Sequence, residues 1–168
     1  MPVTTDIVQM YRRPRAVVQR LLSMGQREDR ALAILMGACL VTFFAQLPRL
    51  ARQNHIEGGS LERAMTYEFL AWMMLWPLMF YGIAALARLI GKVIGGKGTW
   101  FSARITLFWA LLAATPMMLL NGLVAGFIGA SPALNLVGAL WAIAFVTFWI
   151  VGWRAAEWPN SSEQVSAK

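Results

Sequence analysis

Four long apolar runs constrain this chain more than any other feature of its sequence. They cover residues 31–48, 69–90, 105–128 and 133–153, and polar or basic segments separate them. A helix rises about 1.5 Å per residue, so roughly 20 residues cross a hydrocarbon core of about 30 Å. Division of the third run at Asn121 would leave two pieces too short to cross separately. The expected fold class is therefore an all-α, polytopic transmembrane helical bundle of about four spans.

The composition agrees with this class. Of 168 residues, 58% are hydrophobic and only 14% are charged, with a mean hydropathy of +0.56. The net charge of +7 would suggest nucleic-acid binding in a soluble protein, but no helix-turn-helix, zinc finger or aromatic RNA platform accompanies it. We expect anionic membrane lipids to be the partner of this charge, and no nucleic acid. The single cysteine, Cys39, excludes an intramolecular disulfide and a cysteine cluster for a metal.

The domain organisation follows from the position of the runs and of the basic residues. We expect a cytoplasmic segment at 1–30, a transmembrane domain at 31–153 and a polar cytoplasmic tail at 154–168. Basic residues concentrate before the first run and between the second and third runs, whereas acids balance those of the first loop. The positive-inside rule then places both termini in the cytoplasm.

The N-terminal segment carries an amphipathic pattern. Apolar residues, with Pro14 among them, recur at spacings of three or four: Ile7, Tyr11, Pro14, Val18 and Leu21. Four arginines accompany this stripe: Arg12, Arg13, Arg15 and Arg20. Pro14 suits the first turn of a helix that we expect to run to about Met24. Such a helix can lie in the membrane interface, with its arginines on the lipid headgroups of the anionic inner leaflet. The alternative is a helix packed on the cytoplasmic ends of the protein itself.

A glycine-rich segment between the second and third runs resembles a phosphate-binding loop. Residues 91–98 read Gly-Lys-Val-Ile-Gly-Gly-Lys-Gly, with Gly98 where the magnesium-binding hydroxyl should stand. That loop also needs a preceding strand, whereas a membrane-spanning helix is expected here. We therefore interpret the segment as a turn between two spans.

No other motif predicts chemistry. His55, Glu57 and Glu62 could hold a weak metal in the first outer loop, but the chain has no second histidine to complete a usual site. No nucleophile elbow, catalytic triad or pair of catalytic carboxylates is present in the sequence. We therefore expect no catalytic site, no metal and no cofactor, and a protein that is not an enzyme.

The informative residues inside the spans predict kinks and close packing: Pro77, Pro116, Asn121, Gly122 and Gly126. A proline in a membrane helix frees a carbonyl group, which neighbouring side chains re-satisfy. For Pro116, the candidate donors are Thr115 and Asn121. The two glycines form a small-xxx-small pattern that lets helix backbones approach closely. A substrate pathway lined by these residues is the alternative.

Two segments of the chain resemble the Yip (Ypt-interacting protein) domain family. Residues 11–15, Tyr-Arg-Arg-Pro-Arg, precede an amphipathic helix and a span, which is similar to the opening of that family. Residues 95–101, Gly-Gly-Lys-Gly-Thr-Trp-Phe, and the following helix with Pro116 resemble its middle section. The resemblance covers roughly residues 6–154. The family commonly has five spans, where four are counted here.

The resemblance implies a function as well as a fold. Eukaryotic members bind Rab-type GTPases, and the short chain is more similar to bacterial members. It implies a multi-pass protein of the bacterial inner membrane, non-enzymatic, with a role in membrane organisation, in trafficking-like processes, or as a partner or complex subunit. A small transporter or channel that acts as a homo-oligomer is the alternative.

Overall fold

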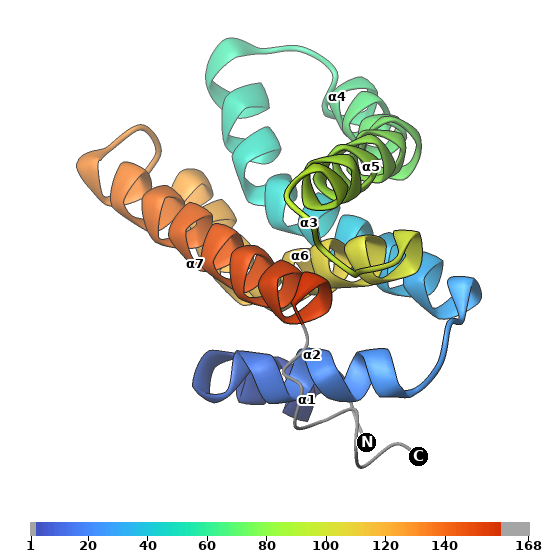
Figure 1. The fold of residues 1–168 in the computed structure, drawn as a ribbon. Helices are drawn as coiled ribbons and strands as arrows, with labels where there is room; N and C mark the ends of the chain where they lie inside the picture. The colour runs from blue at the N-terminus through green and yellow to red at the C-terminus, as the bar shows by residue number, and fades with distance from the viewer. Residues whose placement is uncertain (1–2, 159–168) are drawn as a thin grey trace.

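The computed structural model describes residues 3–158, and within that range all regular elements are helical (Figure 1). They are α1 (Val3–Arg12), α2 (Pro14–Ser23), α3 (Glu28–Glu57), α4 (Leu61–Leu70), a π-helical segment η1 (Ala71–Leu75), α5 (Trp76–Val93), α6 (Trp100–Phe127) and α7 (Pro132–Glu157). Four helices are long and apolar enough to cross a membrane, namely α3, the continuous helix from α4 to α5, α6 and α7. The predicted all-α class with four spans is confirmed. The part of the predicted tail from residue 159 onward lies outside the described residues.

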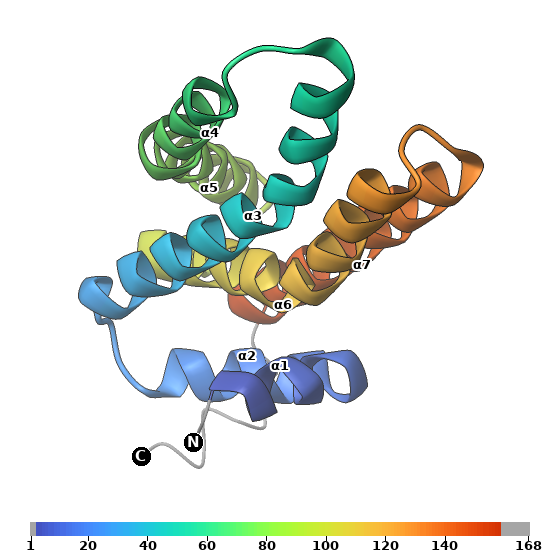
Figure 2. The ribbon, with the colours of Figure 1, turned by 180° about the vertical axis from the view of Figure 1, so that it is seen from behind.

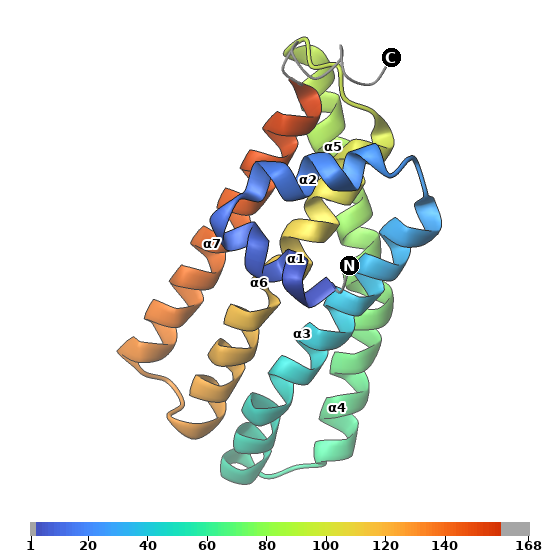
Figure 3. The same ribbon diagram turned by 90° about the horizontal axis from the view of Figure 1, so that it is seen from below.

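The long helices alternate in direction. Figure 3 shows the start of α3, the turn between α5 and α6 and the end of α7 towards one end of the bundle, which we call the terminal end. The short turns at residues 58–60 and 128–131 lie at the opposite end, the loop end. This arrangement is the one that four successive membrane crossings produce.

Helix α6 is the centre of the molecule. All of its residues from 101 to 115 are buried except Arg104, which is half-buried. It packs chiefly against α3 and α7 and also against α5. The two opposite views of the molecule show it between these helices (Figures 1 and 2). A helix that is apolar on all sides belongs in such a position. A capping box begins it, since the Thr99 side chain accepts from the Ser102 N–H at 3.0 Å and Ser102 Oγ accepts from the Thr99 N–H at 2.8 Å.

The N-terminal helices lie across one side of this bundle. Helix α2 packs on α7 and α6, and its apolar side chains Val17, Val18 and Leu21 are buried there. Pro14 begins α2, and the restricted backbone of the residue before a proline separates it from α1. Val18 and Leu21 of the apolar stripe are therefore covered by the protein itself, whereas Tyr11 is 41% exposed, and the helix is still amphipathic.

Two of the helices extend beyond the apolar runs at the loop end. Helix α3 continues through Pro48 to Glu57, and α4 begins at Leu61, so only residues 58–60 connect them. The His55 and Glu57 side chains therefore lie on the last turns of a helix rather than in a loop. Among residues 3–158, no group of three or more His, Cys, Asp and Glu side chains could hold a metal ion.

Candidate functional site

The most distinctive polar site lies at the terminal end, around Glu157. This last residue of α7 is fully buried, with 0% of its surface exposed. Its Oε2 accepts a hydrogen bond from Arg88 Nη1 of α5 at 2.8 Å and another from the Gly98 N–H at 3.0 Å. Its backbone carbonyl accepts from the Lys97 N–H at 2.9 Å. The end of α7 is thereby tied to the turn between α5 and α6, and we call this set of contacts the Glu157 latch.

Three glycines make room for the carboxylate. A Cβ atom added at Gly91 or at Gly98 would lie 2.7 Å from the Glu157 carboxyl carbon, and one added at Gly96 would overlap Oε2. Contacts this short do not occur between real side chains, so a side chain at any of the three positions would displace the Glu157 carboxylate. The segment that resembles a phosphate-binding loop is thus a turn that surrounds an anion, and the anion is a carboxylate of the same chain.

Electrostatically the latch is a buried ion pair. The Arg88 side chain is only 13% exposed, and Glu157 Oε1 has no hydrogen-bond partner within residues 3–158. A buried carboxylate is tolerated only when charge pairing and hydrogen bonds compensate for lost hydration. Sequence reasoning placed Glu157 in the polar tail and missed this role. The available signal was the position of three glycines beside Arg88, which implies a bulky anion within the turn.

The arginines predicted to contact lipid headgroups fall into two groups. Arg12, Arg13 and Arg15 are exposed, and none of them forms an ion pair with a described residue. Arg20 instead forms an ion pair with Asp6, which fastens α2 to α1. The structure therefore leaves three of the four arginines available to an external anion.

Side chains around Pro116 donate hydrogen bonds to the backbone carbonyl groups one turn before the proline. Its missing N–H frees the carbonyl of Leu112, and the Thr115 hydroxyl donates to that oxygen at 2.7 Å, which confirms the role expected of Thr115. The neighbouring carbonyl of Ala113 accepts from the Tyr11 hydroxyl of α1 at 3.1 Å. Burial raises the pKa of Tyr11, so the phenol stays a donor at neutral pH.

Asn121 makes a different contact from the one expected. Its side-chain amide donates to the carbonyl of Leu134 at 3.3 Å and so links α6 to the first turn of α7. It does not reach the carbonyl that Pro116 frees. In the C-terminal half of α6, Asn121 therefore links α6 to α7 and does not satisfy the carbonyl group that Pro116 leaves free.

Gly122 and Gly126 lie where α6 crosses α3. An added Cβ at Gly122 would overlap the carbonyl oxygen of Ala45, and one at Gly126 would overlap Pro48. Such close contact between backbones is the packing that small residues permit in a membrane. Just beyond it, Arg52 of α3 donates to the last carbonyls of α6, those of Gly126 and Phe127, at 3.2 and 3.1 Å.

Pro77 lies directly after the π-helical segment η1. There the Trp76 N–H donates to the carbonyl of Ala71, five residues back, instead of four. The wider turn lets the helix continue past the proline. Both π-bulges and prolines commonly cause a kink in a helix. Pro77 is buried.

Comparison with known proteins adds nothing to this picture. No protein-family model, no curated protein and no solved structure matches the chain. The resemblance to the Yip family rests on its short motifs alone, so function must be argued from the residues themselves.

Proposed function

We propose that this chain is a non-enzymatic integral membrane protein of the bacterial inner membrane, of the Yip type, which organises anionic lipid and binds partners at the cytoplasmic face. The four long apolar helices support a membrane location. The excess of basic residues near the terminal end supports a cytoplasmic position for that end. The motifs at residues 11–15 and 95–101 support the family.

One observation carries the proposal: a rigidly packed hairpin presents exposed arginines. The apolar faces of α1 and α2 are buried on the bundle through Met10, Val17 and Val18, and the Arg20–Asp6 pair joins the two helices. The exposed arginines are therefore held in place rather than carried on a mobile arm. Near an anionic surface each basic residue contributes about 1 kcal/mol, so three supply about 3 kcal/mol before screening.

The outer surface of α7 agrees with a role among lipids. Only 6% of its most apolar window is buried inside the protein, against 50% for α6. Leu136, Leu140 and Ile143 are exposed at spacings of three and four, on one face of the helix. Acyl chains cover such a face in a bilayer, and the basic residues of the terminal end then lie at the level of the headgroups.

The proposal can be tested with the full-length protein reconstituted into vesicles that mix anionic and zwitterionic lipid. The preference of spin-labelled anionic lipid for the protein surface is measured for the wild type and for a variant with Arg12→Gln and Arg13→Gln. We expect the preference to fall at least fivefold, since about 1.4 kcal/mol is a factor of ten and each arginine contributes about 1 kcal/mol. High salt should produce a similar loss.

The matched control is Arg63→Gln, an exposed arginine at the loop end. It removes a charge of the same kind without touching the hairpin. Equal lipid preference in the wild type and the double variant, at low and at high salt, would refute the proposal. A loss of the same size in the control would show that only net charge matters.

A further inference from the structure

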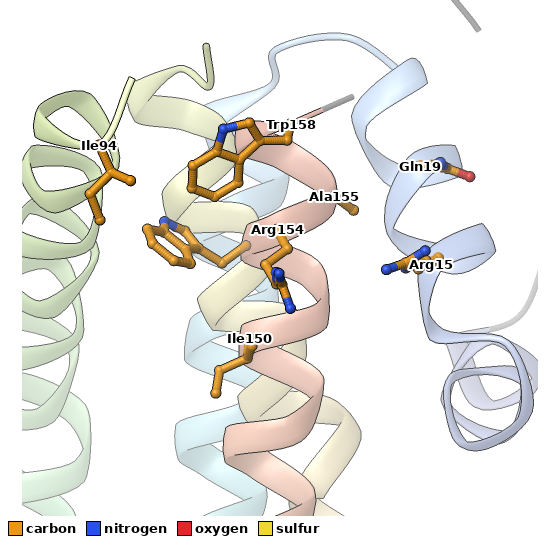
Figure 4. A pocket seen from close by; sticks show the side chains of 8 residues that line it. Arg15, Gln19, Ile94, Ile150, Arg154, Ala155 and Trp158 are labelled. Atoms are coloured by element: carbon orange, nitrogen blue, oxygen red, sulfur yellow. The ribbon is translucent and has the colours of Figure 1, made fainter. Parts of the chain in front are cut away.

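A groove with a basic lining lies at the terminal end, over the last turns of α7. Its volume is about 820 Å³. In Figure 4, α7 forms the centre of the groove with Ile150 and Arg154, and Trp158 follows directly after its last residue. Arg15 of α2 lies on one side of α7, and Ile94, directly after α5, lies on the other. A space of this size accommodates a small organic ligand or a headgroup.

The charge of this groove is uncompensated. Arg15 and Arg154 are both exposed and both line it, while no acidic residue does. Neither arginine forms an ion pair with any residue that the structure describes. Two cations that face one partly enclosed space repel each other, and an anion between them relieves the repulsion. Arginine binds phosphate through a planar pair of N–H donors, which makes phosphate a suitable anion.

Apart from Gln19, the rest of the lining is apolar or aromatic. Ile150 lies one helical turn from Arg154 towards the middle of the bundle and is 46% exposed. Trp153 and Trp158 meet edge to face with their ring centres 5.6 Å apart, and the Trp153 Nε1–H has no acceptor among residues 3–158. Tryptophan favours the boundary between headgroups and acyl chains. Along α7 the arginine side chain of Arg154 therefore lies between the tryptophans near the helix end and an apolar end of the groove at Ile150, towards the middle of the bundle.

We propose that this groove binds one anionic phospholipid of the adjoining leaflet, with its phosphate between Arg15 and Arg154 and its acyl chains over Ile150. A lipid is favoured over free phosphate because the apolar end would stay unoccupied with phosphate alone. This inference rests on the proposed function in one respect, since it needs the terminal end to face the anionic leaflet. It goes beyond the proposed function because it names a single site that binds one lipid molecule.

The test counts bound lipids on the full-length protein in detergent by native mass spectrometry, with phosphatidylglycerol as the probe and phosphatidylcholine as the neutral comparison. We expect the wild type to retain one phosphatidylglycerol. Arg154→Gln and Arg15→Gln should each lower the bound fraction about tenfold, as expected for the loss of one charge-assisted contact. Arg154→Lys should lower it less, since it keeps the charge but loses the planar fork. Arg63→Gln, an exposed arginine at the loop end and outside the groove, should change nothing.

A second measurement keeps the test independent of the purification. Brominated phosphatidylglycerol should quench the tryptophan fluorescence of the wild type more than brominated phosphatidylcholine does, and Arg15→Gln should remove that difference. Equal binding of the two lipids, or no effect of either glutamine variant, would overturn the proposal. Displacement of phosphatidylglycerol by millimolar inorganic phosphate would assign the groove to a soluble anion instead.

The two proposals fail in different ways. The Arg12 and Arg13 variant tests the lipid shell around the hairpin and should leave the single bound lipid in place. Arg154→Gln should lower the occupancy of the bound lipid about tenfold and leave the preference of the surrounding shell intact. If only one of these two expected results is observed, the proposal that predicts the other result is wrong.

Discussion

Replacement of Glu157 is the sharpest test of how the terminal end is held together. In Glu157→Ala, Arg88 loses its charge partner and the Gly98 N–H loses its acceptor, both in a site that is nearly closed to water. Removal of one member of a buried ion pair costs about 3–5 kcal/mol. Since 13% of the Arg88 side chain is exposed, water relieves part of that cost, and we expect a loss near 3 kcal/mol in the free energy of unfolding.

Glu157→Gln separates charge from shape. The carboxamide oxygen can accept both hydrogen bonds in place of Oε2, but it carries no charge, so the loss should be about 1–2 kcal/mol, the difference between a charged and a neutral hydrogen bond. Reversible unfolding in mixed detergent micelles, followed by tryptophan fluorescence, measures these values. The expected order of stability is wild type, then Glu157→Gln, then Glu157→Ala.

The matched control is the ion pair between Glu28 and Arg104, at 2.6 Å. The Glu28 side chain is 52% exposed, so Glu28→Ala should cost less than 1 kcal/mol. Gly98→Ala supplies a further check, because its Cβ would displace the Glu157 carboxyl. The Gly98→Ala and Glu157→Ala double variant should then be no less stable than Glu157→Ala alone. Strict additivity would show that Gly98 does not make room for the Glu157 carboxylate, and equal losses in Glu157→Ala and Glu28→Ala would show that the latch does not stabilise the fold.

Three other predictions follow from the helix contacts and the topology. Gly122→Ala should cost about 1–3 kcal/mol of stability in the same unfolding assay, because the new methyl group overlaps the Ala45 carbonyl and overpacking is costly. Arg52→Gln should cost about 1–2 kcal/mol there, since two carbonyls at the end of α6 lose a charged donor. A cysteine at Ser60 should react with an impermeant thiol reagent in intact cells, whereas one at Ser23 should react only after the membrane is opened.

Each of these predictions has its own control. Gly138→Ala should be nearly neutral, since its Cβ would meet only the Asn121 amide at 3.3 Å. The control for Arg52→Gln is Arg63→Gln, which should leave the free energy of unfolding unchanged because Arg63 is exposed and unpaired among the described residues. Labelling of the Ser23 position from outside would reverse the orientation.

Hydropathy predicts where this chain crosses a membrane but not where its helices end. The run at 31–48 stops at Pro48, because the charged residues Arg49 and Arg52 follow, yet α3 continues to Glu57. The polar turns lie beyond the apolar span, where Arg52 caps α6 and Arg49 pairs with Glu68 at 3.6 Å. A hydrophobic pattern marks the segment that lies in lipid, but it does not show how far the helix extends beyond that segment.

The Glu157 latch escapes prediction for a related reason. Its partners Arg88 and Gly98 lie 69 and 59 positions away in the chain, so no local spacing connects them with Glu157. Thr115 was predictable because its partner is a carbonyl three residues back, within the same helical turn as Pro116. Local geometry follows from the sequence, whereas a contact between two helices needs their relative position.

The latch and the groove lie at the same end of α7, and this makes a final prediction possible. The Trp158 N–H donates to the Arg154 carbonyl at 3.0 Å, so both groove residues belong to the helix end that Glu157 holds. On the opposite wall, Arg15 is held by the packing of α2, which the latch does not touch. Glu157→Ala should therefore lower both stability and the occupancy of phosphatidylglycerol, whereas Arg154→Gln should lower the occupancy alone. If Glu157→Ala loses its stability but keeps the bound lipid, the headgroup is held by α2 rather than by the end of α7.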